Sequence, residues 1–300
     1  MIEMYGNSAV RGRHMGEYEP ISGVGWTAIG VAYARAEECH RDDRLFDDPY
    51  ASAFLEAAPG WSPPGQGEPL VPDAGSVGVA LTWYVAVRTR FCDEFLLAAS
   101  RAECRQVVLL AAGLDARAFR LHWPAGTTLF EVDLPSVLDF KQKVLDEMGA
   151  RPRCRRITLA TDIREALPDR LISAGFDPAK PVVWLPEGLL IYLAPGEVRR
   201  MLATVANMST VGSQLALEHG TMATNALVDL ATTVPALKRY TELWKGGLSV
   251  NTAAWLTARG WQVRAHTAAT MAEKYNRTKP PDSAGAFLTA VRVTAAPSTP

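Results

Sequence analysis

The sequence between residues 105 and 193 alternates short apolar runs with amphipathic stretches, and this alternation constrains the fold more than any other feature. The run QVVLLA at Gln106–Ala111 is rich in β-branched residues and ends in small ones, as a buried strand does. Further strands are predicted over Thr128–Asp133, Cys154–Ala160 and Pro181–Leu185, with helices between them over Asp115–Leu121, Pro135–Met148 and Arg164–Ala174. Strands that alternate with helices over short connections predict a parallel sheet covered on both faces.

The flanking segments are expected to extend this sheet and to add helices. On the N-terminal side we expect helices over Trp26–Cys39, from Asp47-Asp48-Pro49 onward, and from a capping Ser76 to about Ser100. On the C-terminal side we expect helices over Pro195–Asn207, 222–243 and Thr252–Arg259, and strands over Ser213–Glu218, Trp261–Ala265 and Ala284–Thr294. The total is about seven strands, and the last one is expected to be antiparallel.

We interpret residues 1–300 as a single α/β domain with a helical cap. Its expected parts are a loosely ordered N-terminus over 1–20, an N-terminal cap over 24–100, a core over 101–218, a cap insertion over 219–250 and a C-terminal part of the core over 251–294. A chain of 300 residues with 48% apolar positions is long enough to bury a large core.

Charge and composition exclude several classes of function. The 31 basic residues nearly balance the 32 acidic ones, which argues against binding nucleic acid by phosphate neutralisation and against a polybasic membrane patch. Residues 1–20 contain no apolar signal region, and the longest apolar stretch, Val107–Leu114, is too short to span a membrane. The four cysteines lie far apart without metal-ligand spacing, so we expect no metal site and a cytoplasmic protein with reduced thiols.

Each of the four central strands is followed by an acidic residue. They are Asp115, Asp133, Asp162 and Glu187. Because ligands of open parallel sheets bind beyond the carboxyl ends of the strands, these four acids are expected to meet around one ligand. Any one of them alone would more often be a helix cap or a solvated turn residue.

The turn after the first strand narrows the class of ligand. A dinucleotide fingerprint would need glycine at 111, 113 and 116, but only Gly113 is present, and Asp115 would repel a pyrophosphate. Asp133 follows Gly113 by twenty residues, the spacing of an acid that accepts hydrogen bonds from ribose hydroxyls. Adenosine without phosphate, next to a cationic group, describes S-adenosylmethionine. A dinucleotide-dependent oxidoreductase is the disfavoured alternative.

Several motifs together resemble the leucine carboxyl methyltransferase superfamily. They are VVLLAAGLDARAFRL at Val107–Leu121, FEVDLP at Phe130–Pro135 and PEGLLIYL at Pro186–Leu193. Further matching segments lie at Val24–Ala36, Asp43–Ala51, Trp244–Ser249, Trp255–Trp261 and Phe287–Arg292, so the likeness spans about residues 24–293. The chain is most similar to the bacterial, largely actinobacterial, branch of S-adenosylmethionine-dependent O-methyltransferases, which is often tied to polyketide and other natural-product methylation. The resemblance implies a Rossmann-like methyltransferase fold with a seven-stranded, mostly parallel sheet.

The resemblance also implies roles for individual residues. Arg88 is expected to pair with the methionine carboxylate of the cofactor, with Arg35 as a second basic contact, and Glu187 is expected near the methionine amino group. Asp133 is expected to bind the ribose, and Asp162 and Ile163 to flank the adenine. Ala111, Gly113 and Asp115 belong to the turn that approaches the cofactor. The family's turn usually reads GAG, so the methyl group of Ala111 is expected to crowd the cofactor unless the backbone φ is negative there.

The acceptor is expected to be a small-molecule or peptide carboxylate, because a carboxylate is already a nucleophile near neutral pH and needs no general base. A phenol or hydroxyl acceptor is the alternative, with His219 as base. Glu187 and Tyr192 are expected to position the reactants, and the acceptor pocket is expected to contain Trp26, Trp83, Tyr192, Trp244 and Tyr275. A non-catalytic cofactor-binding protein in a biosynthetic complex is the hypothesis from another class. The identity of the acceptor and the oligomeric state stay open.

Overall fold

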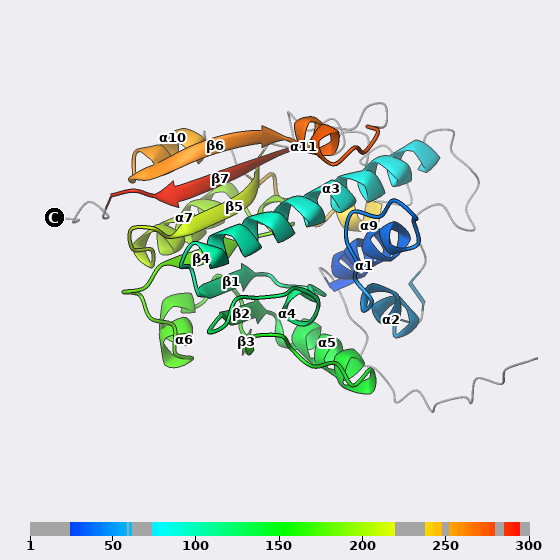
Figure 1. The fold of residues 1–300 in the computed structure, drawn as a ribbon, viewed down its shortest axis with the longest axis horizontal. Helices are drawn as coiled ribbons and strands as arrows, with labels where there is room; N and C mark the ends of the chain where they lie inside the picture. Colours follow the sequence, from blue (N-terminus) through cyan, green and yellow to red (C-terminus); the bar gives the residue numbers. More distant parts are fainter. Residues whose placement is uncertain are drawn as a thin grey trace, which may run out of the picture.

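A seven-stranded sheet runs through the described part of the molecule in the order β3-β2-β1-β4-β5-β7-β6 (Figure 1). The computed structural model describes residues 25–58, 60–61, 74–219, 238–247, 252–279 and 285–294, without the side chains of 74–77, 239 and 240. The strands are β1 (Gln106–Leu110), β2 (Thr128–Asp133), β3 (Arg155–Ala160), β4 (Val182–Leu185), β5 (Gln214–His219), β6 (Trp261–Thr267) and β7 (Ala286–Arg292).

Strands β1 to β5 pair in parallel, and β7 pairs antiparallel with both β5 and β6. From the central β1 the chain first adds β2 and β3 on one side, and then returns to place β4 on the other. The strand order therefore reverses between β1 and β4. In sheets of this kind the crevice at that reversal, beyond the carboxyl ends of the strands, is the usual ligand site.

Helices precede, separate and follow the strands. They are α1 (Gly25–Cys39), α2 (Ala51–Glu56), α3 (Ala74–Arg101), α4 (Arg117–Arg120), α5 (Pro135–Glu147), α6 (Leu167–Ser173), the 3-10 helix η1 (Leu190–Tyr192), α7 (Pro195–Asn207), α9 (Lys238–Thr241), α10 (Thr252–Thr257) and α11 (Ala268–Lys274). In Figure 1, α1, α2 and α9 lie together at the end of the sheet toward which β6 points.

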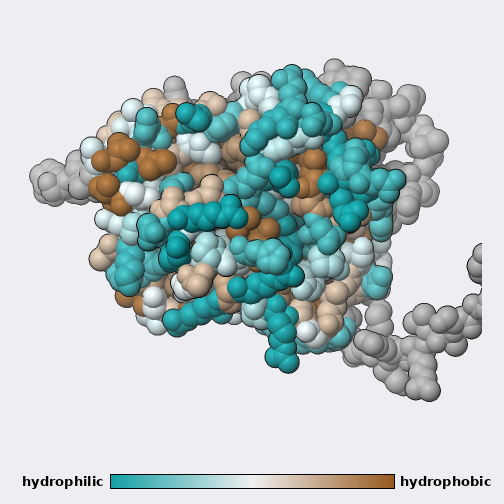
Figure 2. Space-filling view, in the orientation of Figure 1, coloured by the Kyte–Doolittle hydropathy of each residue, from teal (hydrophilic) through white to brown (hydrophobic). Residues whose placement is uncertain are grey.

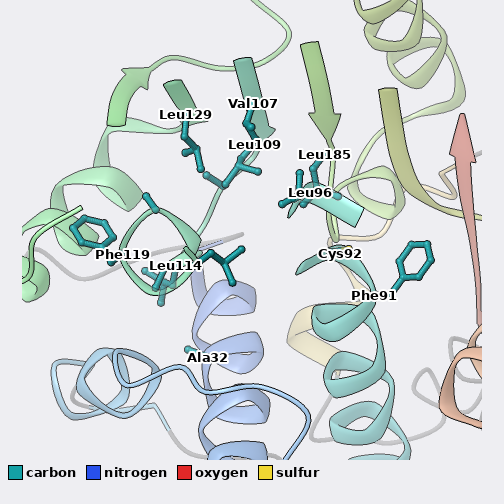
Figure 3. Close-up of a cluster of buried hydrophobic side chains, with 14 of the residues drawn as sticks. Ala32, Phe91, Cys92, Leu96, Val107, Leu109, Leu114, Phe119, Leu129 and Leu185 are labelled. Carbon is teal, nitrogen blue, oxygen red and sulfur yellow. The ribbon is translucent and has the colours of Figure 1, made fainter. Parts of the chain in front are cut away.

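The sheet divides the apolar core into two layers. Because successive residues of a strand face opposite ways, Val107 and Leu109 of β1 pack with α3, α5 and α11, whereas Val108 and Leu110 pack with α6, α7 and α10. Figure 3 shows the first layer, in which Leu109 of β1 and Leu96 of α3 lie near Leu185 of β4. Both faces of the sheet are thus covered, as the continuous apolar strands predicted.

The predicted strands are confirmed, including the antiparallel last strand, with small shifts of their ends. Four predictions about helices need correction. Helix α4 covers only Arg117–Arg120, because Asp115 accepts the Arg117 N–H and forms a turn before the helix. Helix α6 begins at Leu167, α3 begins at Ala74 so that Ser76 is not its cap, and α11 was not predicted. Of the helix expected over 222–243, residues 238–243 lie within the described ranges, and of these Lys238–Thr241 are helical.

The surface seen in Figure 2 is mostly hydrophilic, with a hydrophobic area at the end of the molecule where β7 runs out. Val211 shortly before β5, Val291 in β7 and Val293 directly after β7 are exposed. Within the described ranges, no helix combines the length and the apolar character that crossing a membrane requires.

Candidate functional site

A cavity of about 640 Å³ lies at the carboxyl ends of β1 to β5. Its wall is made by the residues that directly follow these strands, by the facing sides of α1 and α3, and by the segment 243–247. The cavity therefore occupies the crevice at the strand-order reversal, where the four strand-end acids were expected to meet.

All nine residues that were predicted to contact a cofactor line this one cavity. They are Arg35, Arg88, Ala111, Gly113, Asp115, Asp133, Asp162, Ile163 and Glu187. Tyr192, Trp244 and His219 line it as well. Trp26, Trp83 and Tyr275 are not among the described residues that line it.

The turn between β1 and α4 brings the backbone close to helix α1. Gly113 has a φ of 51°, and a Cβ atom there would lie 3.3 Å from the Cβ of Ala28 on α1. Ala111 has a φ of 53°, in the left-handed region that costs an L-residue free energy. Ala111 therefore does not meet the condition of a negative φ, and the alanine stands where glycine would fit without strain.

Asp133 ties this turn to the end of β2. Its Oδ2 accepts the N–H of Gly113 at 2.6 Å, and its Oδ1 accepts the N–H of Leu134 at 2.7 Å. Burial raises the pKa of Asp133, although these two hydrogen bonds act in the opposite direction. Each carboxylate oxygen has a second lone pair, so Asp133 can still accept hydrogen bonds from hydroxyl groups in the cavity.

The end of β3 adds a more exposed acid. Asp162 pairs with Arg164, whose Nε lies 2.9 Å from Oδ1 and 3.0 Å from Oδ2. The hydrogen bonds from Arg164 hold the pKa of Asp162 below its ordinary value. Ile163, between Asp162 and Arg164 in the chain, packs against the second core layer. The charged pair and an apolar side chain therefore lie next to each other at this side of the cavity.

Glu187, after β4, is the centre of a buried charge cluster. Its Oε1 accepts from Nη2 of Arg35 at 3.1 Å and from Nε of Arg88 at 3.0 Å, and its Oε2 accepts from Nη1 of Arg117 at 2.6 Å. Burial alone would raise the pKa of Glu187, but the three arginines hold it well below the ordinary value. Glu187 is therefore an anion fixed through both oxygens.

Arg88 also joins this cluster to β5. Its Nη1 lies 2.5 Å from Oε1 of Glu218, while Oε2 of Glu218 accepts the N–H of Gly188 at 2.6 Å. Burial alone would lower the pKa of Arg88, but the charges of Glu218 and Glu187 outweigh this effect and raise the pKa above its ordinary value. Gly188 has a φ of 67°, and a Cβ there would lie 3.5 Å from Nη1 of Arg88. The guanidinium thus lies directly beside the backbone of the β4 turn.

Asp115 has a more structural environment than the sequence suggested. It lines the cavity, but it accepts the N–H of Arg117 at 2.7 Å and pairs with the Arg117 side chain. Burial would raise the pKa of Asp115, and Arg117 together with Arg35 lowers it overall. The carboxylate of Asp115 is thus already bound by Arg117, the first residue of α4.

Sequence reasoning missed Arg117, Glu218 and Asp93. Glu218 could have been found, because it ends the predicted strand Ser213–Glu218 just as the other acids follow theirs. Arg117 gave no such signal: in the sequence it is one of several arginines on a predicted helix, whereas in the structure its side chain is fully buried. Asp93 pairs with both Arg117 and Arg120, a contact that links α3 to α4 across the fold.

The remaining part of the cavity is more apolar. Leu190, Leu193 and Leu243 line it together with Tyr192 and Trp244. His219, at the end of β5, has a buried Nδ1 without a hydrogen-bond partner among the described residues. This part can accommodate an apolar group next to the charge cluster.

Comparisons with known proteins identify the family. A sequence model of the leucine carboxyl methyltransferase family matches residues 28–206. A relative from Parafrankia sp. (strain EAN1pec), named as an S-adenosyl-L-methionine-dependent methyltransferase, is 45% identical over 295 residues, which cover 96% of this chain and 93% of the relative. One from Frankia alni with the same kind of name is 45% identical over 277 residues, covering 92% and 97%.

Solved structures agree on the fold. A duf574 family protein from Streptomyces avermitilis has a TM-score of 0.57 at 17% identity, covering 89% of this chain and 97% of that one. A methyltransferase structure from Thermobifida fusca has a TM-score of 0.54 at 15% identity, covering 96% and 100%. The expected Rossmann-like methyltransferase fold is thereby confirmed. The chain belongs to the leucine carboxyl methyltransferase family and is an S-adenosylmethionine-dependent methyltransferase.

Proposed function

We propose that the cavity binds S-adenosylmethionine across the ends of β1 to β4 and that the enzyme methylates a carboxylate oxygen of a small apolar metabolite, of polyketide or peptide type. The observation that carries the proposal is that one cavity is lined by two different sets of polar residues. Asp133 offers hydrogen-bond acceptors in one set, and the arginine-held Glu187 belongs to the other.

The residues of each set fit one part of the cofactor. Asp133 would accept hydrogen bonds from the ribose hydroxyls, and Asp162 with Ile163 would border the adenine. Arg35 and Arg88 would bind the methionine carboxylate, while Glu187 would receive the ammonium group. The close approach of Gly113 to α1 leaves a turn without a side chain where the cofactor would pass. The bound cofactor would supply a methyl group on a sulfonium sulfur.

The charge of the cluster supports a cationic ligand. Four arginines, at positions 35, 88, 117 and 120, pair within it with five acids, at positions 48, 93, 115, 187 and 218. Carboxylates thus outnumber guanidinium groups by one. A sulfonium compound with an amino acid end carries a net positive charge and would balance this excess.

The carboxylate acceptor is supported by the family and by the apolar part of the cavity. A carboxylate reaches the reaction already ionised, so the protein needs only to orient it in line with the methyl group and to exclude water. Leu190, Leu193 and Tyr192 would form the wall that holds the apolar body of the acceptor. Glu187 and Tyr192 would act by positioning.

A hydroxyl or phenol acceptor is the second candidate, and one observation favours it. The Nδ1 atom of His219 is buried at the end of β5 without a partner in the described structure, so it could accept the proton of a hydroxyl group. If His219 is the base, replacing it should lower kcat by about 10²–10⁴-fold. If the acceptor is a carboxylate, the same replacement should leave kcat nearly unchanged.

The test combines binding with turnover. Calorimetry with S-adenosylhomocysteine measures cofactor binding, and methyl-labelled S-adenosylmethionine with matched panels of apolar carboxylic acids and phenols measures transfer. Labelled methyl esters would support the carboxylate proposal, and labelled aryl ethers lost in His219→Asn would support the second candidate. Cofactor binding without transfer to any member of either panel would favour a non-catalytic binding protein.

A further inference from the structure

Arg117 is a fully buried charge that binds residues of the cavity wall, but it does not line the cavity itself. Its side chain has no exposed surface, and it extends from the start of α4 beneath the turn that follows β1. A buried guanidinium is costly unless its N–H groups are satisfied. The groups that bind the Arg117 guanidinium therefore indicate which residues it positions.

Its N–H groups bind three carboxylates from three different elements. Nε donates to Asp93 on α3 at 2.6 Å, and Nη1 donates both to Asp115 and to Oε2 of Glu187 at 2.6 Å. Nη2 points to the backbone carbonyl of Thr89 at 3.4 Å. Asp93 and Asp115 thus hold the guanidinium in place, and the second N–H of Nη1 donates to Glu187.

Glu187 is held differently on its two oxygens. Oε2 is bound by Arg117, which lies outside the cavity wall, whereas Oε1 is bound by Arg35 and Arg88, which lie on it. A ligand carboxylate in the cavity would compete with Oε1 for Arg35 and Arg88, but it cannot reach Arg117. The contact to Oε2 would therefore persist when the ligand binds.

We propose that Arg117 is a positioning residue that keeps Glu187 ionised and oriented, so that Oε1 is free to receive the ammonium group of the cofactor once Arg35 and Arg88 bind its carboxylate. This inference rests on the proposed function. It assigns to Arg117 an effect on recognition of the amino group that is separate from its effect on stability.

The experiment compares two ligands that differ only in this group. S-adenosylhomocysteine and its analogue without the α-amino group are titrated by calorimetry into the wild-type protein, Arg117→Lys and Arg117→Gln. A lysine cannot reproduce the fork that reaches all three carboxylates. We expect both variants to reduce the preference for S-adenosylhomocysteine over the analogue by at least about tenfold, as loss of a charged hydrogen bond would.

Arg120→Lys is the matched control. Arg120 lies on the same single turn of helix, is nearly as buried and binds the same Asp93 at 2.6 and 2.7 Å. Among the described residues its acidic partners are Asp93 and Asp48, not Glu187. We expect Arg120→Lys to lower Tm and to leave the ligand preference unchanged. In a Glu187→Gln background the preference should already be lost, and adding Arg117→Lys should change it no further.

Each other outcome overturns the inference. If Arg117 is only structural, its variants weaken both ligands equally and the preference stays at the wild-type value. If neither Arg117 variant folds while Arg120→Lys does, Arg117 serves stability alone. A wild-type protein that binds both ligands equally refutes the contact between Glu187 and the ammonium group, and with it the role of Arg117, but not the binding of the cofactor in this cavity. A wild-type protein that binds neither ligand refutes cofactor binding as well.

Discussion

The backbone N–H of Gly113 donates a 2.6 Å hydrogen bond to Oδ2 of Asp133, and this contact joins the ends of β1 and β2 into one unit. Gly113 also lies against Ala28 of α1, so the same turn is fixed on its other side. Gly113 and Asp133, which both line the cavity, thus position each other.

Asp133→Asn should lower the affinity for S-adenosylhomocysteine by at least about tenfold, because ribose hydroxyls would lose a charged acceptor. The amide keeps the size of the side chain but can accept only one of the two backbone N–H bonds that Asp133 accepts, so the variant should lose about 1–3 kcal/mol of stability and still fold. Calorimetry gives the affinity, and far-ultraviolet circular dichroism checks the fold.

Asp139→Asn is the control for this change, since Asp139 is an exposed residue of the helix that follows Asp133. It should leave both affinity and stability unaltered. Equal affinity of Asp133→Asn and wild type would remove Asp133 from the cofactor site.

The low pKa of Glu187 predicts how stability depends on pH. Burial opposes ionisation, but Arg117, Arg88 and Arg35 lower the pKa of the folded state below that of the unfolded chain. The ion pairs therefore contribute fully above the ordinary glutamate pKa of about 4.3, and their contribution is lost as the pH falls toward the folded-state value.

Glu187→Gln makes this contribution measurable. At pH 7 the variant should be less stable by about 3 kcal/mol, because it leaves buried arginines without their anion. In denaturant titrations, the difference in free energy of unfolding between wild type and variant should be constant from pH 7 to about 5. It should become smaller below about pH 4.3. A difference that grows on acidification would contradict the sign of the pKa shift.

Most of the architecture followed from the sequence because it depends on local patterns. Buried parallel strands are continuous apolar runs, and their connections place the next residue at the carboxyl edge of the sheet, so the positions of Asp133, Asp162 and Glu187 could be inferred. The family resemblance added Arg35 and Arg88, which come from helices far away in the sequence.

The charge network could not be inferred in the same way. Arg117 contacts Asp93 and Glu187 across 24 and 70 positions of sequence, and only the folded packing of α3 on α4 brings them together. Helix α11 was missed because its sequence AATMAEK is short and the residues that it buries, Ala268 and Ala272, give only a weak apolar pattern. The backbone angle of Ala111 was equally invisible, since alanine gives no sign of a left-handed conformation.

Tyr275→Phe tests whether Tyr275 belongs to the acceptor pocket. The Tyr275 hydroxyl donates to Oε2 of Glu94 at 3.1 Å, where Lys274 also binds. Its loss should lower the free energy of unfolding by about 1 kcal/mol and leave both cofactor affinity and the KM of any acceptor unchanged. Tyr192→Phe is the counterpart inside the cavity and should change the acceptor KM. A changed KM in Tyr275→Phe would return this tyrosine to the acceptor pocket.

Ala111→Gly should stabilise the protein, which is unusual for a substitution by glycine. The φ of 53° at Ala111 costs an L-residue about 1–2 kcal/mol, and glycine removes this cost while losing about 0.5–1 kcal/mol to the greater freedom of the unfolded chain. We therefore expect a net gain of about 0.5–1 kcal/mol in denaturant titrations. Because Ala111 lines the cavity, removal of its methyl group should also increase the affinity for S-adenosylhomocysteine.

Ala112→Gly is the matched control: its backbone lies outside the left-handed region, so the same change should destabilise the fold by about 1 kcal/mol. Equal destabilisation of the two variants would show that the turn carries no strain at Ala111.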